Sequence, residues 1–118
     1  MIFRDPFKKS FRIFVKPGRT DMRKAMNGLL GIVNEVIQVN PYDEVLFAFC
    51  GRSRKLIKLL YWDGNGFCLW QKRLATGSFP WPNSEEQAIQ LTTEEMRWLL
   101  TGIDFRKRHK IEFFDLTG

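Results

Sequence analysis

Three short apolar segments between residues 45 and 72 constrain the fold of this chain most strongly. They are Val45–Cys50, Lys55–Trp62 and Phe67–Lys72, and each carries apolar residues on both alternating faces. Such a pattern predicts strands that are covered on two sides. Between the last two segments, Asp63-Gly64-Asn65-Gly66 combines two glycines with an Asn that tolerates positive φ. This turn sequence predicts a tight hairpin.

A strand and a helix are expected before these segments. In the predicted strand, Phe11, Ile13 and Val15 alternate with Arg12, and Pro17-Gly18 ends the strand. Thr20 is the expected N-cap of a long helix that closes at Asn40-Pro41. Its predicted core seam recurs at helical spacing through Met22, Met26, Leu29, Val33 and Val36.

A second, shorter helix is predicted near the end of the chain, after a loop from Ala75 to Ser84. Thr92 and Glu95 form a capping-box pattern, and the helix stops at Gly102. A final strand is expected within residues 104–118, through Ile111, Phe113 and Phe114. The predicted fold is thus one α+β domain over residues 1–118, with a mainly antiparallel sheet packed by one long and one short helix.

Composition excludes several classes of protein. The 118 residues are 44% hydrophobic and 27% charged, which disfavours disorder and coiled coils. The longest apolar run has six residues, Val45–Cys50, whereas a bilayer requires about 20. We find no secretory signal and expect a cytoplasmic protein. With Cys50, Cys68 and His109 as the only thiols and imidazole, no Cys/His zinc site can form within one chain, and the thiols are expected to pack as apolar groups.

The positive charge lies in two blocks. The formal net charge is +6, with eight basic and two acidic residues in 1–24 and six basic and one acidic in 51–75. Two such blocks are expected of a protein with one basic face. A basic face favours a polyanionic partner such as nucleic acid. In the first block, Arg19, Arg23 and Lys24 surround the expected helix start, where a phosphate would satisfy both the cations and the free amides. Alternatively, Asp21 in the same turn offsets their charge.

The second block interleaves bases with aromatic rings. Basic side chains on a hairpin can hold phosphates while exposed rings stack on bases. Most of these rings are expected in the core, with one or two free to stack. The basic residues are Arg52, Arg54, Lys55, Lys58, Lys72 and Arg73, and the rings are Tyr61, Trp62, Phe67, Trp70, Phe79 and Trp81.

Little in the sequence indicates catalysis. Asp21, Asp63 and Asp104 are the acids that a two-metal nuclease could use. Each has a local backbone reason to be present, at a helix start, in a turn and after a helix end. We find no phosphate-binding glycine loop, nucleophile elbow or zinc-protease motif. We therefore expect no enzyme activity, no metal site and no cofactor.

Several separated motifs in residues 11 to about 105 resemble the small TnpB-type accessory proteins of bacterial insertion sequences of family sixty-six. The motifs, in order, are Thr20-Asp21-Met22-Arg23-Lys24, Gly28-Leu29, Leu46-Phe47-Ala48-Phe49, Lys58-Leu59-Leu60-Tyr61-Trp62-Asp63, Gly66-Phe67, Leu69-Trp70, Lys72-Arg73-Leu74, Gly77, Trp81-Pro82 and Gly102-Ile103-Asp104. The resemblance implies a protein encoded beside a larger transposase that carries the cutting chemistry. It does not imply the longer RNA-guided nuclease of the same name. Two departures from the family are the thinned basic run at Gly51–Lys58 and the C-terminal tail, within 106–118, which ends in acidic and aromatic residues instead of a basic run.

Two functions follow from these observations. The first is a non-catalytic accessory protein of transposition that contacts DNA at the element ends and assists the transposase of the same mobile element. The second is a protein-interaction subunit that binds the transposase or itself without touching DNA. The sequence leaves the oligomeric state open.

Overall fold

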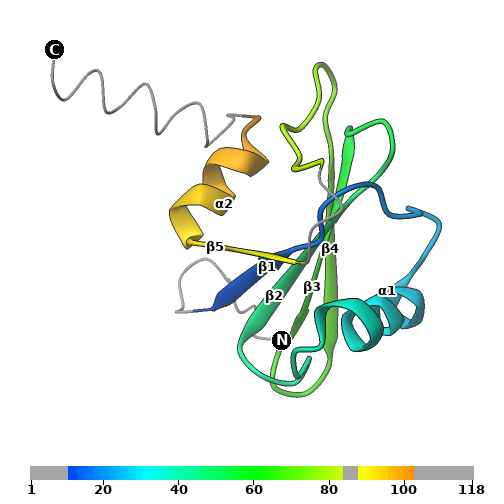
Figure 1. The fold of residues 1–118 in the computed structure, drawn as a ribbon, viewed down its shortest axis with the longest axis vertical. Helices are drawn as coiled ribbons and strands as arrows, with labels where there is room; N and C mark the ends of the chain where they lie inside the picture. Colours follow the sequence, from blue (N-terminus) through cyan, green and yellow to red (C-terminus); the bar gives the residue numbers. More distant parts are fainter. Residues whose placement is uncertain (1–10, 84–87, 103–118) are drawn as a thin grey trace, which may run out of the picture.

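The helices pack on opposite faces of a five-stranded sheet (Figure 1). The structure is a computed structural model that describes residues 11–83 and 88–102. The expected final strand and Asp104 lie outside these residues. The sheet order is β4-β3-β2-β1-β5. The described elements are β1 (Arg12–Val15), α1 (Met26–Ile32), the π-helical turn η1 (Val33–Ile37), β2 (Val45–Cys50), β3 (Leu56–Trp62), β4 (Phe67–Arg73), β5 (Ile89–Leu91) and α2 (Thr93–Leu100).

The sheet is mixed. β1 and β2 pair in parallel, with Arg12 opposite Val45, because the helical segment between them carries the chain back along one face of the sheet. The β1–β5, β2–β3 and β3–β4 pairs are antiparallel. The predicted α+β class and predominantly antiparallel pairing are confirmed, and the β3–β4 hairpin turns at residues 63–66 as expected.

Each face of the central strands packs on a different helix. On β2, Val45, Phe47 and Phe49 belong to the cluster beneath α1 and η1. The alternate β2 residues Leu46, Ala48 and Cys50 belong to the cluster beneath α2. All six β2 residues are therefore buried, as the two-sided apolar pattern predicts.

The same prediction is wrong for β4. This strand is an edge of the sheet, and Trp70, Gln71 and Arg73 are exposed. Its apolar residues still contact both cores, with Leu69 against one cluster and Cys68 against the other. The other edge is β5, a three-residue strand that the sequence pattern does not predict.

The predicted long helix is not formed. α1 begins at Met26, after the N-cap Ala25, and not after Thr20. The N–H of Thr20 donates to the carbonyl of Cys50 at 2.8 Å, which joins this part of the chain to the end of β2. Asp21 then starts a separate turn, with its Oδ1 accepting the N–H of Arg23 at 2.9 Å. Tertiary hydrogen bonds thus override the local helical pattern.

The helix also ends differently from the prediction. Seven α-helical residues are followed by the five residues of η1, where the N–H of Gln38 donates to the carbonyl of Val33 at 2.7 Å. This wider turn places Ile37 in the core and leaves Val36 49% exposed. Val36 is therefore not a core residue, contrary to the predicted seam.

α2 forms where the sequence predicts it. Thr92 Oγ1 accepts the N–H of Glu95 at 3.1 Å, and Glu95 Oε1 accepts the N–H of Thr92 at 2.9 Å. Gly102 follows the helix with a φ of 88°, which a glycine adopts without strain. Within 11–83 and 88–102, no helix has the length and apolar character needed to cross a membrane.

Candidate nucleic-acid interface

Two adjoining concavities at one end of the sheet are rich in arginine. The larger has a volume of about 1090 Å³ and the smaller about 280 Å³, and Arg19, Gly51 and Arg52 line both. Arg23 and Arg73 line the larger one, and Arg54 lines the smaller. We call this surface, formed by Arg19, Arg23, Arg52, Arg54 and Arg73, the arginine concavity.

Sheet topology brings these arginines together. β1 and β2 run in parallel, so the loops that follow them emerge at the same end of the sheet and supply Arg19 and Arg52. Arg73 at the end of β4 pairs with Leu56 at the start of β3, which places it at that end as well. Gly51 allows the two loops to approach, because a Cβ at this position would lie 2.7 Å from Cγ of Met22.

Four of the five guanidinium groups have no partner within the described chain. Arg19, Arg52 and Arg73 are exposed and Arg54 is half-buried. None of these side chains forms a hydrogen bond or an ion pair with another described residue. They are free to bind an anion, and the guanidinium fork matches the geometry of a phosphate.

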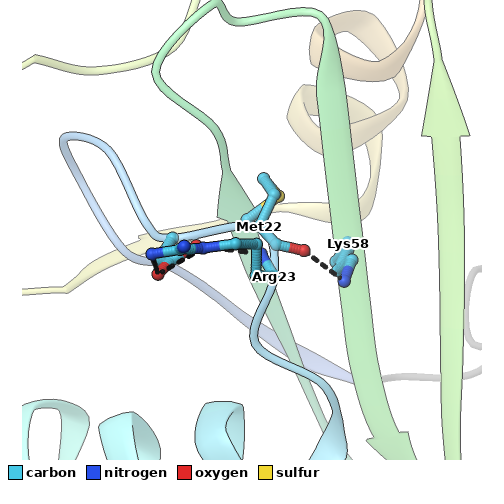
Figure 2. A network of polar contacts seen from close by, with 4 residues as sticks. Met22, Arg23 and Lys58 are labelled. Atoms are coloured by element: carbon cyan, nitrogen blue, oxygen red, sulfur yellow. Dashed lines mark hydrogen bonds and ion pairs between the residues drawn. The ribbon is translucent and has the colours of Figure 1, made fainter.

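Arg23 is held by Asp21 in the same loop (Figure 2). Its Nε donates to Oδ1 at 3.0 Å, and its Nη2 donates to Oδ2 at 2.9 Å. Hydrogen bonds from the Arg23 side chain and backbone lower the pKa of Asp21 to about 2. Local charge compensation by Asp21, one of the two alternatives from the sequence, therefore applies to Arg23. Arg19, Arg23 and Lys24 all precede the N-cap of α1, so they do not surround the helix start as predicted.

Lys58 is buried, although the sequence predicts it among the bases that are available to hold phosphates. It lies in the middle of β3, and only 8% of it is exposed. Its Nζ donates to the carbonyl oxygen of Met22 at 2.7 Å (Figure 2) and to that of Lys24 at 2.9 Å. Because the opposite residue on β2 is Phe49, this position faces the side of the sheet that carries α1. Lys58 thus holds the loop that displays Arg23.

The other predicted lysines also lie outside the lining of the arginine concavity. Lys72 Nζ donates to the carbonyl of Leu100 at 3.0 Å and so joins β4 to the last turn of α2. Lys55 is exposed, and its Nζ donates to the carbonyl of Gly77 at 3.0 Å. The Lys24 side chain is exposed and passes over Gly28 of α1. The structure thus separates the predicted basic residues into arginines that line the concavity and lysines that do not.

The aromatic residues of the second basic block are mostly covered. Tyr61, Phe79 and Trp81 are buried, Trp62 and Phe67 are half-buried, and Trp70 is 36% exposed. The indole N–H of Trp81 donates to the carbonyl of Lys16 at 2.9 Å. The expectation of a largely buried set, with one or two rings free, is confirmed.

Tyr42, an aromatic residue that the sequence pattern missed, lies with Trp62 and Phe67 at the opposite end of the sheet. Tyr42 is 60% exposed, and its ring centroid lies 5.0 Å from that of Trp62 and 5.3 Å from that of Phe67. The available signal was a large ring between Pro41 and Asp43 in a turn segment. We call Tyr42, Trp62 and Phe67 the aromatic end.

The acids considered for metal chemistry do not converge among the described residues. Asp21 lies at the arginine concavity, whereas Asp63 follows β3 at the end of the sheet where β2 begins. No group of three or more His, Cys, Asp or Glu residues within 11–83 and 88–102 could hold a metal ion. Burial raises the pKa of the Cys50 thiol to about 11 and also raises that of Cys68, which agrees with apolar packing of both thiols.

Comparisons with known proteins place the chain in a family. No solved structure matches it. An uncharacterized protein of Sinorhizobium fredii (strain NBRC 101917 / NGR234), y4hO, is 43% identical over 101 residues, which cover 86% of this chain and 88% of y4hO. A second uncharacterized protein of that strain, y4jC, is 31% identical over 99 residues, covering 84% and 85% of the two chains. The family model described as "IS66 Orf2 like protein" matches residues 11–110. As the sequence motifs predict, this chain belongs to the IS66 Orf2-like family.

Proposed function

We propose that this protein is a non-catalytic accessory protein of transposition that contacts DNA phosphates through the arginine concavity. Membership of the IS66 Orf2-like family supports the link to an insertion sequence. The observation that carries the DNA contact is the gathering of Arg19, Arg52, Arg54 and Arg73, all without a described partner, on one concave surface. Such a surface positions a protein on the phosphate backbone without reading bases.

The choice of arginines over lysines follows from their contacts. The ammonium groups of Lys55, Lys58 and Lys72 already donate to backbone carbonyls. The exposed guanidinium groups keep all their N–H donors for a ligand, and each can take two phosphate oxygens at once. We therefore assign phosphate binding to the arginines and a supporting role to Lys58 and Lys72.

Two double variants with the same change in net charge test this assignment. Arg52→Gln with Arg73→Gln removes two bases from the concavity. The control, Arg12→Gln with Arg97→Gln, removes two exposed bases from the start of β1 and from α2. Fluorescence anisotropy with a labelled duplex, from low to high salt, measures the dissociation constant and the slope of log K against log salt.

We expect the concavity variant to bind more weakly and to reduce the slope by up to about 1.8, at about 0.9 per phosphate contact for two contacts. The control pair should change the slope by less than half of that amount. Equal effects of the two variants would show that only net charge matters. DNA binding that is absent at low salt would overturn the proposal outright.

Assistance to a separate transposase completes the proposed role. We expect the purified protein to leave supercoiled DNA intact with Mg²⁺ or Mn²⁺, because its basic side chains hold DNA and its described acids do not converge. Adding the transposase of the same element should produce cleavage or joining of the DNA. This protein should then raise the yield of the cleaved or joined product. Nicking by this protein alone would instead assign it the cutting chemistry.

Protein interaction is a second candidate function, favoured by the aromatic end. Exposed aromatic rings are enriched at protein interfaces, and Tyr42 is the most exposed large hydrophobic residue of the described chain. If this end binds the transposase, Tyr42→Ala should weaken their co-purification. A protein that binds transposase but not DNA would establish this function in place of the first.

A further inference from the structure

Asp21 is the only acidic residue among those that line the arginine concavity in the described chain. Its two carboxylate oxygens face Arg23, with distances of 3.0 Å from Nε to Oδ1 and 2.9 Å from Nη2 to Oδ2. A phosphodiester presents two non-bridging oxygens to the same edge of a guanidinium group. The carboxylate thus makes the two contacts with Arg23 that a phosphate could also make.

We propose that Asp21 is an internal substitute for phosphate, which holds Arg23 in the free protein and is displaced when a DNA phosphodiester binds. This inference rests on the proposed function, because it assigns the ligand and the regulation of the same concavity. DNA binding would then exchange one anion for another on Arg23. The measured DNA affinity would therefore reflect the difference in free energy between the Arg23–phosphate contact and the Arg23–Asp21 contact.

The pair is easily opened. The Arg23 side chain is 92% exposed and that of Asp21 is 41% exposed. Exposed ion pairs of this kind are weak, because water and salt screen them. With its pKa lowered to about 2, Asp21 stays ionised at every physiological pH, so displacement depends on competition between anions and not on protonation.

Arg23 does not need Asp21 to keep its place in the fold. Lys58 Nζ binds the carbonyls of Met22 and Lys24 on either side of Arg23, at 2.7 and 2.9 Å. The N–H of Lys24 also donates to the carbonyl of Asp21 at 3.1 Å. The loop is thus fixed by contacts that do not involve the carboxylate charge. The remaining contact, from the N–H of Arg23 to Asp21 Oδ1, is one that an Asn side-chain oxygen also accepts.

A double-mutant cycle tests the displacement. Duplex affinity is measured by anisotropy at low salt for the wild type, Asp21→Asn, Arg23→Gln and the double variant. Asp43→Asn is the matched control, because it removes the same charge and a different exposed pair, with Arg12 at 3.7 Å. We expect Asp21→Asn to bind DNA at least about threefold more tightly than the wild type, and Asp43→Asn to stay within about twofold.

The sign of the coupling decides the outcome. If Asp21 competes with phosphate, Arg23→Gln should weaken binding by an additional factor of about two to five in the Asp21→Asn background, because breaking the pair no longer offsets the Arg23–phosphate contact. An equal or smaller loss in that background would overturn the displacement and make Asp21 a general repulsive charge or a positioning residue for Arg23. The Arg52 and Arg73 double variant, measured alongside, shows separately whether the concavity binds DNA.

Discussion

Lys58 supports the arginine concavity without lining it. Its buried ammonium group donates hydrogen bonds to the carbonyls of Met22 and Lys24. These carbonyls precede α1, which begins only at Met26, so they lie outside its hydrogen-bonding pattern. Replacement by Met keeps the apolar stem but leaves both acceptors without this donor. We expect Lys58→Met to lower the free energy of unfolding by about 2 kcal/mol, as unsatisfied buried groups do.

Urea denaturation measures this loss. Lys55→Met is the control, because it removes an exposed lysine whose hydrogen bond to Gly77 is solvent-accessible, and it should change stability by less than about 0.5 kcal/mol. A Lys58→Met variant as stable as the control would mean that water or another donor replaces Lys58 at the two carbonyls.

Gly51 is required for a close approach. A Cβ here would lie 2.7 Å from Met22 Cγ, so Gly51→Ala must displace the Met22 side chain, which belongs to the loop that carries Asp21 and Arg23. We expect a loss of about 1–3 kcal/mol in the free energy of unfolding, which is usual for overpacking. Gly66→Ala should be nearly neutral, since no atom lies within 4 Å of the added Cβ. Equal stability of the two variants in thermal denaturation would show that Met22 moves aside at little cost.

At the scale of elements, the starts of the two helices are determined by different contacts. α2 carries a complete capping box between Thr92 and Glu95, so its start depends on contacts within four residues. Thr92→Ala should lower the free energy of unfolding by about 1 kcal/mol. Thr76→Ala, in an exposed loop, should have little effect. If chemical denaturation finds the two variants alike, packing of Met96 and Leu99 alone must hold the helix in place.

α1 has no side-chain cap, and its start follows from contacts with β2 and β3. The Thr20 N–H pairs with Cys50, and Lys58 holds the carbonyls of Met22 and Lys24. A helical pattern that extends back to Met22 therefore predicts the element but not its first residue. Val36 departs from its pattern for a different reason: the helical spacing predicts it in the core seam, and the π-helical turn η1 leaves it exposed.

At the scale of the whole molecule, the sheet separates two surfaces. The loops after β1 and β2 place arginines at one end, whereas Tyr42, Trp62 and Phe67 lie where β2 begins and β3 ends. We expect Tyr42→Ala to leave the duplex dissociation constant and its salt slope unchanged within about twofold, because no charge changes and the phosphate contacts lie at the other end. A larger change in anisotropy titrations would mean that DNA reaches the aromatic end.

The sequence alone determined the features that depend on neighbours along the chain. The β3–β4 hairpin follows from Asp63-Gly64-Asn65-Gly66, α2 follows from its capping box, and the two-sided burial of β2 follows from its unbroken apolar run. Family membership was also readable, because its motifs are local strings in a fixed order. Each of these signals is complete within a few residues.

Only the tertiary structure decided which basic residues share a surface. Arg52 and Lys58 are six positions apart in one basic segment, yet Arg52 lines the concavity while Lys58 is buried against the loop before α1. The parallel β1–β2 pairing brings Arg19 beside Arg52, and the edge position of β4 leaves Arg73 exposed. Charge is a property of the residue, but its availability depends on strand order and on which carbonyls the fold leaves without a donor, and both are long-range consequences of packing.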